Sequence, residues 1–524
     1  MGARYWGGLA TVAILAIWRM RWFLFGPPTS DSWMALHSVH EFSLWAVATD
    51  PLTAGYAYNV VFEPLFVAAH AFGEALAPWL GNFAYHVLAL LGLLLGGERL
   101  ARLIYYGTHS VAAGLAMAAV YMTTPQIWFA VGETSSYHYT LATWFSLCSI
   151  EAAWRAYVAG RVPPPASTWL SALAYAFALG CKPSAAGIPL LIFLLLLGAG
   201  RGLKPAVAFV FPHAVVLALY VAWAFHILGS IGGYPFTPVI VLSNLIVAPL
   251  AISAVAWGHG AVILVLMLAA LALGGRKLWV WLAMAIASFG PLSLAYAMAF
   301  DGYTAAKLML PLAFFLLYLG WVLARFSPIV TMLLAGLLIG LQLRSFGPVQ
   351  SYLDETIREE TEYRTTREPL AVRSPSGLFV AYAWAHQYAP EPKGELIAFM
   401  TPEDVQLYRA LEGEFPPEMR TVGIEGIPKI TTVPLDPQGI ELGADAAGHF
   451  FLHIDDSLSG QLRQAFFYEN GKTRFLFSWP VVRSSSVIPL NHSYRWILIY
   501  RTTDDGSPWS VLQWSSPFFR NPYP

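Results

Sequence analysis

Most ionisable side chains in the apolar half of this chain lie in short segments between apolar runs. Acids in two of these segments suit a general base or a metal ligand, and cations in two others suit a phosphate group. Ionisable groups in or beside membrane spans are costly, so together they indicate a functional site, although each one alone is also compatible with a solvated surface residue. The residues are Asp31, His37, His40, Glu41, Asp50, Glu63, Glu133, His138, Lys182, Asp301 and Lys307.

Two pairs among these residues have specific alternatives. His37 and His40 are three residues apart in an expected helix, a spacing that permits a metal pair, but no clear set of further ligands accompanies them. Lys182 and Lys307 could extend their ammonium groups to the membrane surface without binding a ligand. A divalent metal therefore stays an alternative, and the sequence indicates no other cofactor.

The composition identifies the elements that must position these residues. The chain is 57% hydrophobic and 12% charged, whereas soluble domains carry roughly 25% charged residues. It is therefore expected to be an integral membrane protein for most of its length. The net charge of -1 and the absence of a basic tail argue against a nucleic-acid partner. Cys148 and Cys181 lie in apolar surroundings, so we expect small core residues and no disulfide framework.

Apolar segments long enough to cross about 30 Å of hydrocarbon recur up to about residue 345. They predict eleven spans, the first of which is a retained helix and not a cleaved signal peptide. Residues 42–77 are apolar but broken by prolines and acids, which favours helices lying at the interface within one long loop. The spans are 6–25, 83–103, 109–125, 137–157, 168–181, 184–200, 205–228, 245–273, 278–299, 308–324 and 328–345.

The positions of Lys and Arg residues predict which ends of the spans face the cytoplasm. No Lys or Arg occurs from Trp22 to Glu98, so that stretch is expected outside, and the later basic clusters all fall on the opposite, cytoplasmic side. Arg19 and Arg21, near the outer end of the first span, are the exception. The N-terminus is then cytoplasmic, and the candidate residues share the outer face of a plasma or inner membrane.

The character of the chain changes after the last span. Residues 346–374 are densely charged and predict a helical connector, and residues 375–524 predict an extracytoplasmic domain that is α/β or β-rich. "GELIAFM" indicates a strand, and "TPEDVQLYRALEG" indicates a helix capped by Thr401. Turns at Asn470-Gly471 and Asp505-Gly506 each predict a β-hairpin. The expected domains are thus 1–345 in the membrane with a first external loop at 26–82, then 346–374 and 375–524.

Several stretches of residues 5–345 resemble the GT-C membrane glycosyltransferases, in particular the protein-mannosyltransferase and aminoarabinose-transferase branch. The resemblance lies in the order and shared facing of the stretches. They are "SDSWMALHSVHEF", "DPLTAGYAYNVVFEPLFVAAHAFG", "GETSSYHYTLATWFSLCSIEAAWRAY", "LSALAYAFALGCKPSAAGIPLLIFLLL" and "GYTAAKLMLPLAFFLLYLGW".

This resemblance implies a polytopic α-helical fold of about eleven spans and assigns roles to single residues. Asp31 matches the catalytic acid of the family and would deprotonate the acceptor hydroxyl, while Glu133 matches the acid of the second loop. Lys182 and Lys307 match positions that face a lipid phosphate, and Arg344 could join them. The further substrate-binding candidates are His37, His40, Glu41, Glu63, His138 and Asp301.

The implied function is an inverting glycosyltransferase that takes a sugar from a polyprenyl-phosphate donor to a protein, lipid or glycan acceptor at the outer face. The first loop has a single Asp followed by Ser where protein-mannosyltransferases carry paired Asp-Glu. A catalytically silent subunit of a cell-envelope complex therefore stays an alternative. A lipid or glycan transporter is a second alternative, although transporters place ionisable groups near the midplane and these lie at the outer rim.

Overall fold

The computed structural model describes residues 2–29, 32–50, 63–159, 165–228, parts of 250–272, residues 307–365 and ten strands between residues 370 and 514. The chain divides into two compact units. The helical unit comprises Met1–Thr29 and Val60–Ile357, and the second unit comprises Ser30–Asn59 and Arg358–Pro524.

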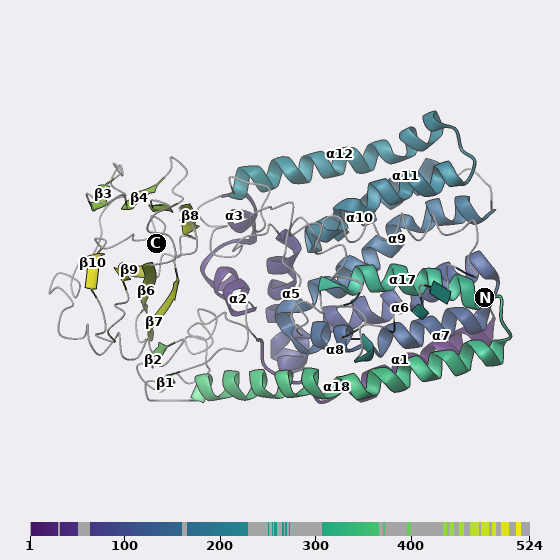
Figure 1. The fold of residues 1–524 in the computed structure, drawn as a ribbon, viewed down its shortest axis with the longest axis horizontal. Coiled ribbons are helices and arrows are strands. Elements are labelled where there is room, and N and C mark those ends of the chain that lie inside the picture. Colours follow the sequence, from purple (N-terminus) through teal and green to yellow (C-terminus); the bar gives the residue numbers. More distant parts are fainter. Residues whose placement is uncertain are drawn as a thin grey trace. The chain divides into compact units, whose positions relative to one another are not determined.

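Most long helices of the helical unit, among them α1, α7, α12, α17 and α18, run in similar directions (Figure 1). The helices of this unit coincide with nine of the eleven predicted spans, and the other two, 245–273 and 278–299, lie largely outside the described residues. The helices are α1 (Ala3–Met20), α5 (Pro64–Leu80), α6 (Val87–Thr108), α7 (Val111–Met122), α8 (Pro125–Gly132), α9 (His138–Ala159), α10 (Pro165–Cys181), α11 (Ile188–Gly198), α12 (Leu203–Leu228), α17 (Met309–Leu323) and α18 (Pro328–Thr365). Three short 3-10 turns join some of them: η1 (Gly81–Tyr85), η2 (Thr134–Ser136) and η3 (Pro183–Gly187).

Glycines let the central helices approach closely. A Cβ atom at Gly92 of α6 would come within 2.8 Å of the backbone nitrogen of Leu141 in α9. One at Gly114 of α7 would come within 2.8 Å of the carbonyl oxygen of Ala101 in α6. Such contacts are typical of helices packed in membranes, where small residues replace a hydrophobic driving force. Every residue of α17 is buried, so this helix lies within the described bundle.

The exterior of the helical unit is apolar. Ile329, Leu333 and Leu337 recur every four residues along α18 and are all at least 60% exposed. On α12, Phe211 and Leu219 are similarly exposed. Two described helical stretches, Leu203–Ile227 and Pro328–Gly347, are long and apolar enough to cross a membrane. An apolar stripe of this kind has no favourable place in water, so the unit is that of a helical membrane protein.

Arg19 and Arg21, the exceptions to the charge asymmetry, lie against aromatic rings. The Arg19 guanidinium is 5.3 Å from the ring centroid of Trp128 and 5.8 Å from that of Phe346. Arg21 stacks over Trp18 and donates a hydrogen bond to the Trp18 carbonyl at 2.6 Å. Cation–π contacts stabilise an arginine on such rings, which gives both residues a local reason for their position.

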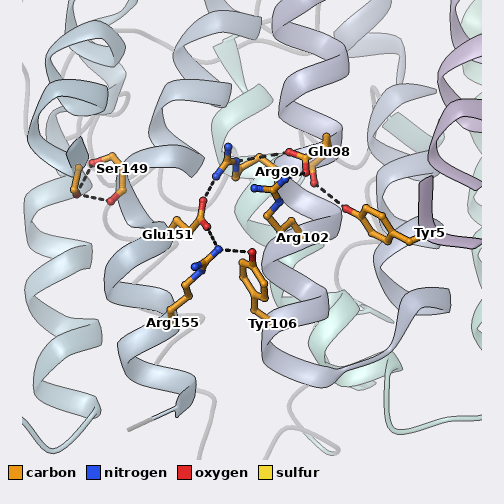
Figure 2. Close-up of polar contacts among 9 residues, drawn as sticks. Tyr5, Glu98, Arg99, Arg102, Tyr106, Ser149, Glu151 and Arg155 are labelled. Carbon is orange, nitrogen blue, oxygen red and sulfur yellow. Dashed lines mark hydrogen bonds and ion pairs between the residues drawn. The ribbon is translucent and has the colours of Figure 1, made fainter. Parts of the chain in front are cut away.

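Figure 2 shows how charged residues join α6 to α9. Glu151 of α9 pairs with Arg99 of α6 and with Arg155 one turn further along its own helix. Arg102 pairs with Glu98 at 2.7 Å, and Arg155 also donates to the Tyr106 hydroxyl. All three arginines belong to the clusters that the sequence places on the cytoplasmic side, and the two glutamates balance most of their charge.

Both cysteines belong to the described bundle. Cys148 is partly buried, Cys181 is buried, and neither is disulfide-bonded. The burial of Cys181 agrees with the expected small core residue, whereas Cys148 is less enclosed.

The last predicted span and the charged residues after it belong to one continuous helix, α18. α18 continues for eighteen residues beyond Gly347, the end of its apolar stretch. Its later residues still pack on the bundle, because a Cβ atom at Gly132 would meet Leu353 and one at Gly26 would meet Ile357. The charged residues after the span thus extend the last helix and do not form a separate one.

The second unit contains two short helices and two β-sheets. The helices are α2 (Ser32–Glu41) and α3 (Leu44–Thr49), and Ser43 caps α3 by accepting a hydrogen bond from the Ala46 amide. The sheets have the strand orders β1-β2-β7-β6-β9-β10 and β3-β4-β5-β8. The strands are β1 (Leu370–Ala371), β2 (Leu396–Phe399), β3 (Val433–Asp436), β4 (Ile440–Ala444), β5 (Phe450–Ile454), β6 (Leu462–Asn470), β7 (Thr473–Pro480), β8 (Ser485–Ile488), β9 (Tyr494–Arg501) and β10 (Ser510–Trp514).

The strand pairing confirms both predicted hairpins. Strands β6 and β7 pair antiparallel with Asn470 opposite Thr473, so the two strands are joined where the Asn-Gly signal indicated. Strands β9 and β10 also pair antiparallel, and β2 is the strand expected in "GELIAFM". The helix expected in "TPEDVQLYRALEG" lies outside the described residues. The position of this unit on the outer side of the membrane stays a prediction.

Candidate functional site

Four candidate residues stand at the ends of helices of the helical unit. Glu63 immediately precedes α5, and Glu133 immediately follows α8. His138 is the first residue of α9, and Lys182 directly follows α10. Pro64 at the first position of α5 begins that helix, because its fixed φ suits a helix start and its missing N–H is not needed there. Polar side chains therefore gather where apolar helices stop.

Glu63 binds two of these residues at once. Lys182 donates a hydrogen bond from Nζ to Glu63 Oε1, and His138 Nε2 lies 3.5 Å from Glu63 Oε2. The three residues are only 5–8% exposed. Lys182 also lies over the ring of Tyr139, 4.6 Å from its centroid. We call Glu63, His138, Lys182 and Lys307 the charged cluster.

The two lysines of this cluster oppose the effect of burial on the pKa of the Glu63 carboxyl. Burial raises the pKa of the Glu63 carboxyl above its usual value, because a charged group is poorly stabilised away from water. Lys182 opposes this shift most strongly, and the buried Lys307, two residues before the start of α17, acts in the same direction. The cluster thus contains two ammonium groups close to one carboxylate, an arrangement that suits an anion better than a cation.

Aromatic rings surround the charged cluster on α5 and α9. The rings of Phe66 and Tyr137 are parallel with centroids 6.0 Å apart, and the His138 ring meets Phe66 edge-on at 5.3 Å. The Tyr137 hydroxyl donates to the carbonyl of Phe66. This packing fixes the start of α5 against the start of α9, and so holds Glu63 beside His138.

His70 is a buried neutral imidazole near these rings. Its Nδ1 atom lies 2.9 Å from the Phe66 carbonyl, which can only accept, so Nδ1 carries the proton. Burial lowers the pKa of His70 to about 4. Its Nε2 atom finds no hydrogen-bond partner among the residues that the structure describes.

Glu133 belongs to a second group, which we call the threonine bridge: Thr29, Glu133 and Thr134. The Thr29 amide donates to Thr134 Oγ1 at 2.7 Å, and the Thr134 amide donates to Thr29 Oγ1 at 3.0 Å. Thr29 Oγ1 in turn donates to Glu133 Oε1 at 2.7 Å. All three residues are at most 1% exposed. The bridge joins the end of the α1 connection to the turn η2 across more than a hundred residues.

The structure brings together part of the predicted site. Glu63, His138, Lys182 and Lys307 form the charged cluster, and His138 and Glu133 lie on either side of the same turn. Arg344 is exposed on α18 and contacts none of the cluster residues.

The other predicted residues are not placed at the site. His37 and Glu41 belong to α2, and His40 is exposed on the same helix. Asp31 and Asp301 lie outside the described residues.

Several residues of the site were not among the sequence candidates. Thr29, Thr134, Tyr137, Tyr139 and His70 all contact a candidate residue or the wall around one. Neutral hydroxyl and aromatic side chains are common near membrane surfaces, so residue type alone did not distinguish them. The "GPPT" stretch before Ser30 was the available signal, because two prolines restrict the backbone that leads into Thr29.

The described residues do not form a metal site. No group of three or more His, Cys, Asp or Glu residues in the described part of the chain is arranged to hold a metal ion. The Glu63 carboxylate is paired with the Lys182 ammonium, which repels a divalent cation. The charged cluster is therefore unsuited to a metal, and no step of the proposed reaction depends on one.

Comparison with known proteins gives a similarity among solved structures. No protein family and no curated protein matches the sequence. Among solved structures, the chain is similar to the crystal structure of ArnT from Cupriavidus metallidurans bound to undecaprenyl phosphate. The sequences are 12% identical, the TM-score is 0.46, and the match covers 79% of this chain and 89% of that one. ArnT is an aminoarabinose transferase of the GT-C family, the family that the sequence resembles.

Proposed function

We propose that the protein is an inverting glycosyltransferase that uses a polyprenyl-phosphate-linked sugar at the outer face of an inner membrane. The observation that carries the proposal is the buried pairing of Lys182 with Glu63, with His138 and Lys307 close by. Two buried ammonium groups beside one carboxylate are suited to the charge of a phosphate leaving group. The orientation deduced from Lys and Arg would put this cluster on the outer face.

The proposed reaction is a direct displacement at the anomeric carbon. The acceptor hydroxyl forms the new C–O bond as its proton passes to the Asp31 carboxylate. The bond between the anomeric carbon and the phosphate oxygen breaks, and its electron pair leaves with the lipid phosphate. Lys182 and Lys307 stabilise the developing phosphate charge, and Arg344 could contact the lipid head group at the membrane surface. A single in-line displacement inverts the anomeric centre.

Binding of a lipid phosphate to the charged cluster must change the contact between Lys182 and Glu63. Glu63 already holds Lys182, so a phosphate that contacts this ammonium must compete with a carboxylate. Protonation of Glu63 would release Lys182, and burial favours the protonated form. We therefore assign Glu63 the part of a counter-ion that is displaced by the lipid phosphate.

The test is sugar transfer by the purified full-length protein in lipid nanodiscs. Undecaprenyl phosphate, the lipid held by ArnT, is the first carrier to test, linked to several radiolabelled sugars. Asp31→Asn should abolish transfer while donor binding persists, and Lys182→Gln should weaken donor binding. Lys204→Gln, an exposed lysine at the start of α12, is the matched control and should leave both unchanged.

Other outcomes favour the alternatives. Transfer that survives Asp31→Asn removes Asp31 from the role of base. Absence of both transfer and donor binding in the wild type, across all sugars, favours the structural-subunit hypothesis. Movement of labelled lipid between leaflets without transfer favours the transporter.

A further inference from the structure

We infer that Thr29 is a positioning residue, which holds the chain entering the first loop against Glu133 through the threonine bridge. The inference rests on the proposed function and extends it, because Asp31 follows Thr29 by two residues. Thr29 touches no reacting group of the proposed reaction. Its amide holds the backbone that leads to Asp31, and its hydroxyl holds the Glu133 carboxylate.

The geometry of the bridge is reciprocal. Each threonine amide donates to the hydroxyl of the other threonine, at 2.7 and 3.0 Å. A hydroxyl has one proton and can accept further bonds, so Thr29 Oγ1 accepts from the Thr134 amide while donating to Glu133 Oε1. Three hydrogen bonds thus involve Thr29: two use its Oγ1 atom and one uses its backbone amide. All three are buried away from water. Hydrogen bonds to a carboxylate are stronger than those between neutral groups.

The surroundings make this contact rigid. Pro27 and Pro28 precede Thr29 and fix two consecutive φ angles. His86 lies between the same two segments, with Nδ1 2.7 Å from the Val131 carbonyl and Nε2 3.2 Å from the Gly26 carbonyl. Both carbonyls only accept, so a neutral imidazole, which has one N–H, donates a hydrogen bond to one of them. The same two chain segments are therefore in contact at His86 and again at the bridge. A segment tied at both points has little freedom to change its approach to η2.

The consequence concerns two acids that are far apart in sequence. Asp31 lies two Cα–Cα steps from Thr29, which is at most about 8 Å of chain. Glu133 is bonded directly to Thr29. The bridge therefore fixes the chain two residues before Asp31 against the Glu133 carboxylate, and loss of the Thr29 hydroxyl should free that chain. Misplacement of a reacting group by about 1 Å can reduce a rate about 100-fold.

The experiment compares Thr29→Val with Thr29→Ser in the full-length protein. Valine keeps the shape of threonine and removes its hydroxyl, whereas serine keeps the hydroxyl. Thr143→Val is the matched control, because Thr143 is equally buried and donates to the Tyr139 carbonyl of its own helix, away from the threonine bridge. Transfer is measured as kcat and as KM for the lipid-linked donor.

The expected result is a reduction of kcat by about 10- to 100-fold in Thr29→Val, with KM for the donor unchanged within about twofold. Thr29→Ser should recover most of the wild-type kcat, and Thr143→Val should retain it. Wild-type kcat in Thr29→Val overturns the inference. It is equally overturned if Thr29→Ser is as impaired as Thr29→Val, or if Thr143→Val is impaired to the same extent.

A second measurement separates this inference from the proposed function. If the wild type transfers no sugar, the proposed function fails, and amide hydrogen exchange of residues 30–36 then decides the inference. Faster exchange in Thr29→Val, but not in Thr29→Ser or Thr143→Val, supports positioning by the bridge. Equal exchange in all four proteins overturns it.

Discussion

Lys182 donates a hydrogen bond to Glu63 across 119 residues of sequence, and both side chains are almost completely buried. A buried ion pair is costly to break, because removal of one partner leaves the other charge without compensation. It is also not required for stability, since apolar residues of similar volume can replace such a pair. Under the proposed function, the pair at the ends of these two apolar helices serves ligand binding, and the stability of its two members can be tested separately.

Removal of one partner should destabilise the protein more than removal of both. Glu63→Gln leaves the Lys182 ammonium buried beside Lys307, and we expect a loss of about 3 kcal/mol in the free energy of unfolding. The double variant Glu63→Gln with Lys182→Met should recover at least half of that loss. Denaturant unfolding in detergent provides the measurement. Additive losses in the two single variants would contradict the pairing. Arg155→Gln, whose side chain is 49% exposed, serves as the control and should change stability by less than about 1 kcal/mol.

The same substitution should have the opposite effect on lipid binding. With Glu63→Gln, the Lys182 ammonium is no longer held by the Glu63 carboxylate, so undecaprenyl phosphate should bind about five- to tenfold more tightly. Isothermal titration or native mass spectrometry of the protein in nanodiscs measures this. Weaker binding in Glu63→Gln would mean that Glu63 contacts the ligand itself and is not a displaced counter-ion.

Stability should fall as the pH decreases from about 6.5 to 4 through His70. Burial lowers the pKa of His70 to about 4 in the folded protein, whereas the unfolded chain titrates near 6.5. Between these values the unfolded state binds the extra proton, so stability rises with pH in this window and the effect is complete above it. The full effect is at most about 3 kcal/mol.

Thermal unfolding of the wild type and of His70→Leu across this pH range measures the contribution. The variant should have a flatter dependence on pH, because the imidazole that binds the proton on unfolding is gone. Identical slopes would mean that His70 is not buried as a neutral group.

Close helix packing makes one glycine intolerant of substitution. Gly114→Ala would place a Cβ atom 2.8 Å from the Ala101 carbonyl oxygen, and backbone cannot move aside as a flexible side chain can. We expect a loss of about 1–3 kcal/mol in stability. Gly340→Ala is the matched control, because nothing lies within 4 Å of a Cβ atom there. A Gly114→Ala protein that unfolds at the wild-type temperature would show that α6 and α7 are not this close.

The sequence by itself determined the elements. Apolar runs of sufficient length predicted helices, and the structure has helices at nine of those places. The Asn470-Gly471 turn predicted the hairpin of β6 and β7, since this pair of residues adopts the turn that matches strand twist. These features depend on neighbouring residues, so a local pattern was sufficient. The sequence also identified Glu63, His138, Lys182 and Lys307 as candidates, because ionisable residues are rare in such a chain.

Only the tertiary structure decided which of these residues meet. Glu63 and Lys182 are separated by 119 residues, and no local pattern states that one neutralises the other. The Thr29 hydroxyl donates to Glu133, 104 residues away. A threonine in the sequence does not by itself indicate such a contact. Pairing between distant side chains depends on how the helices pack, which is set by the sum of many apolar contacts and not by the residues of the pair.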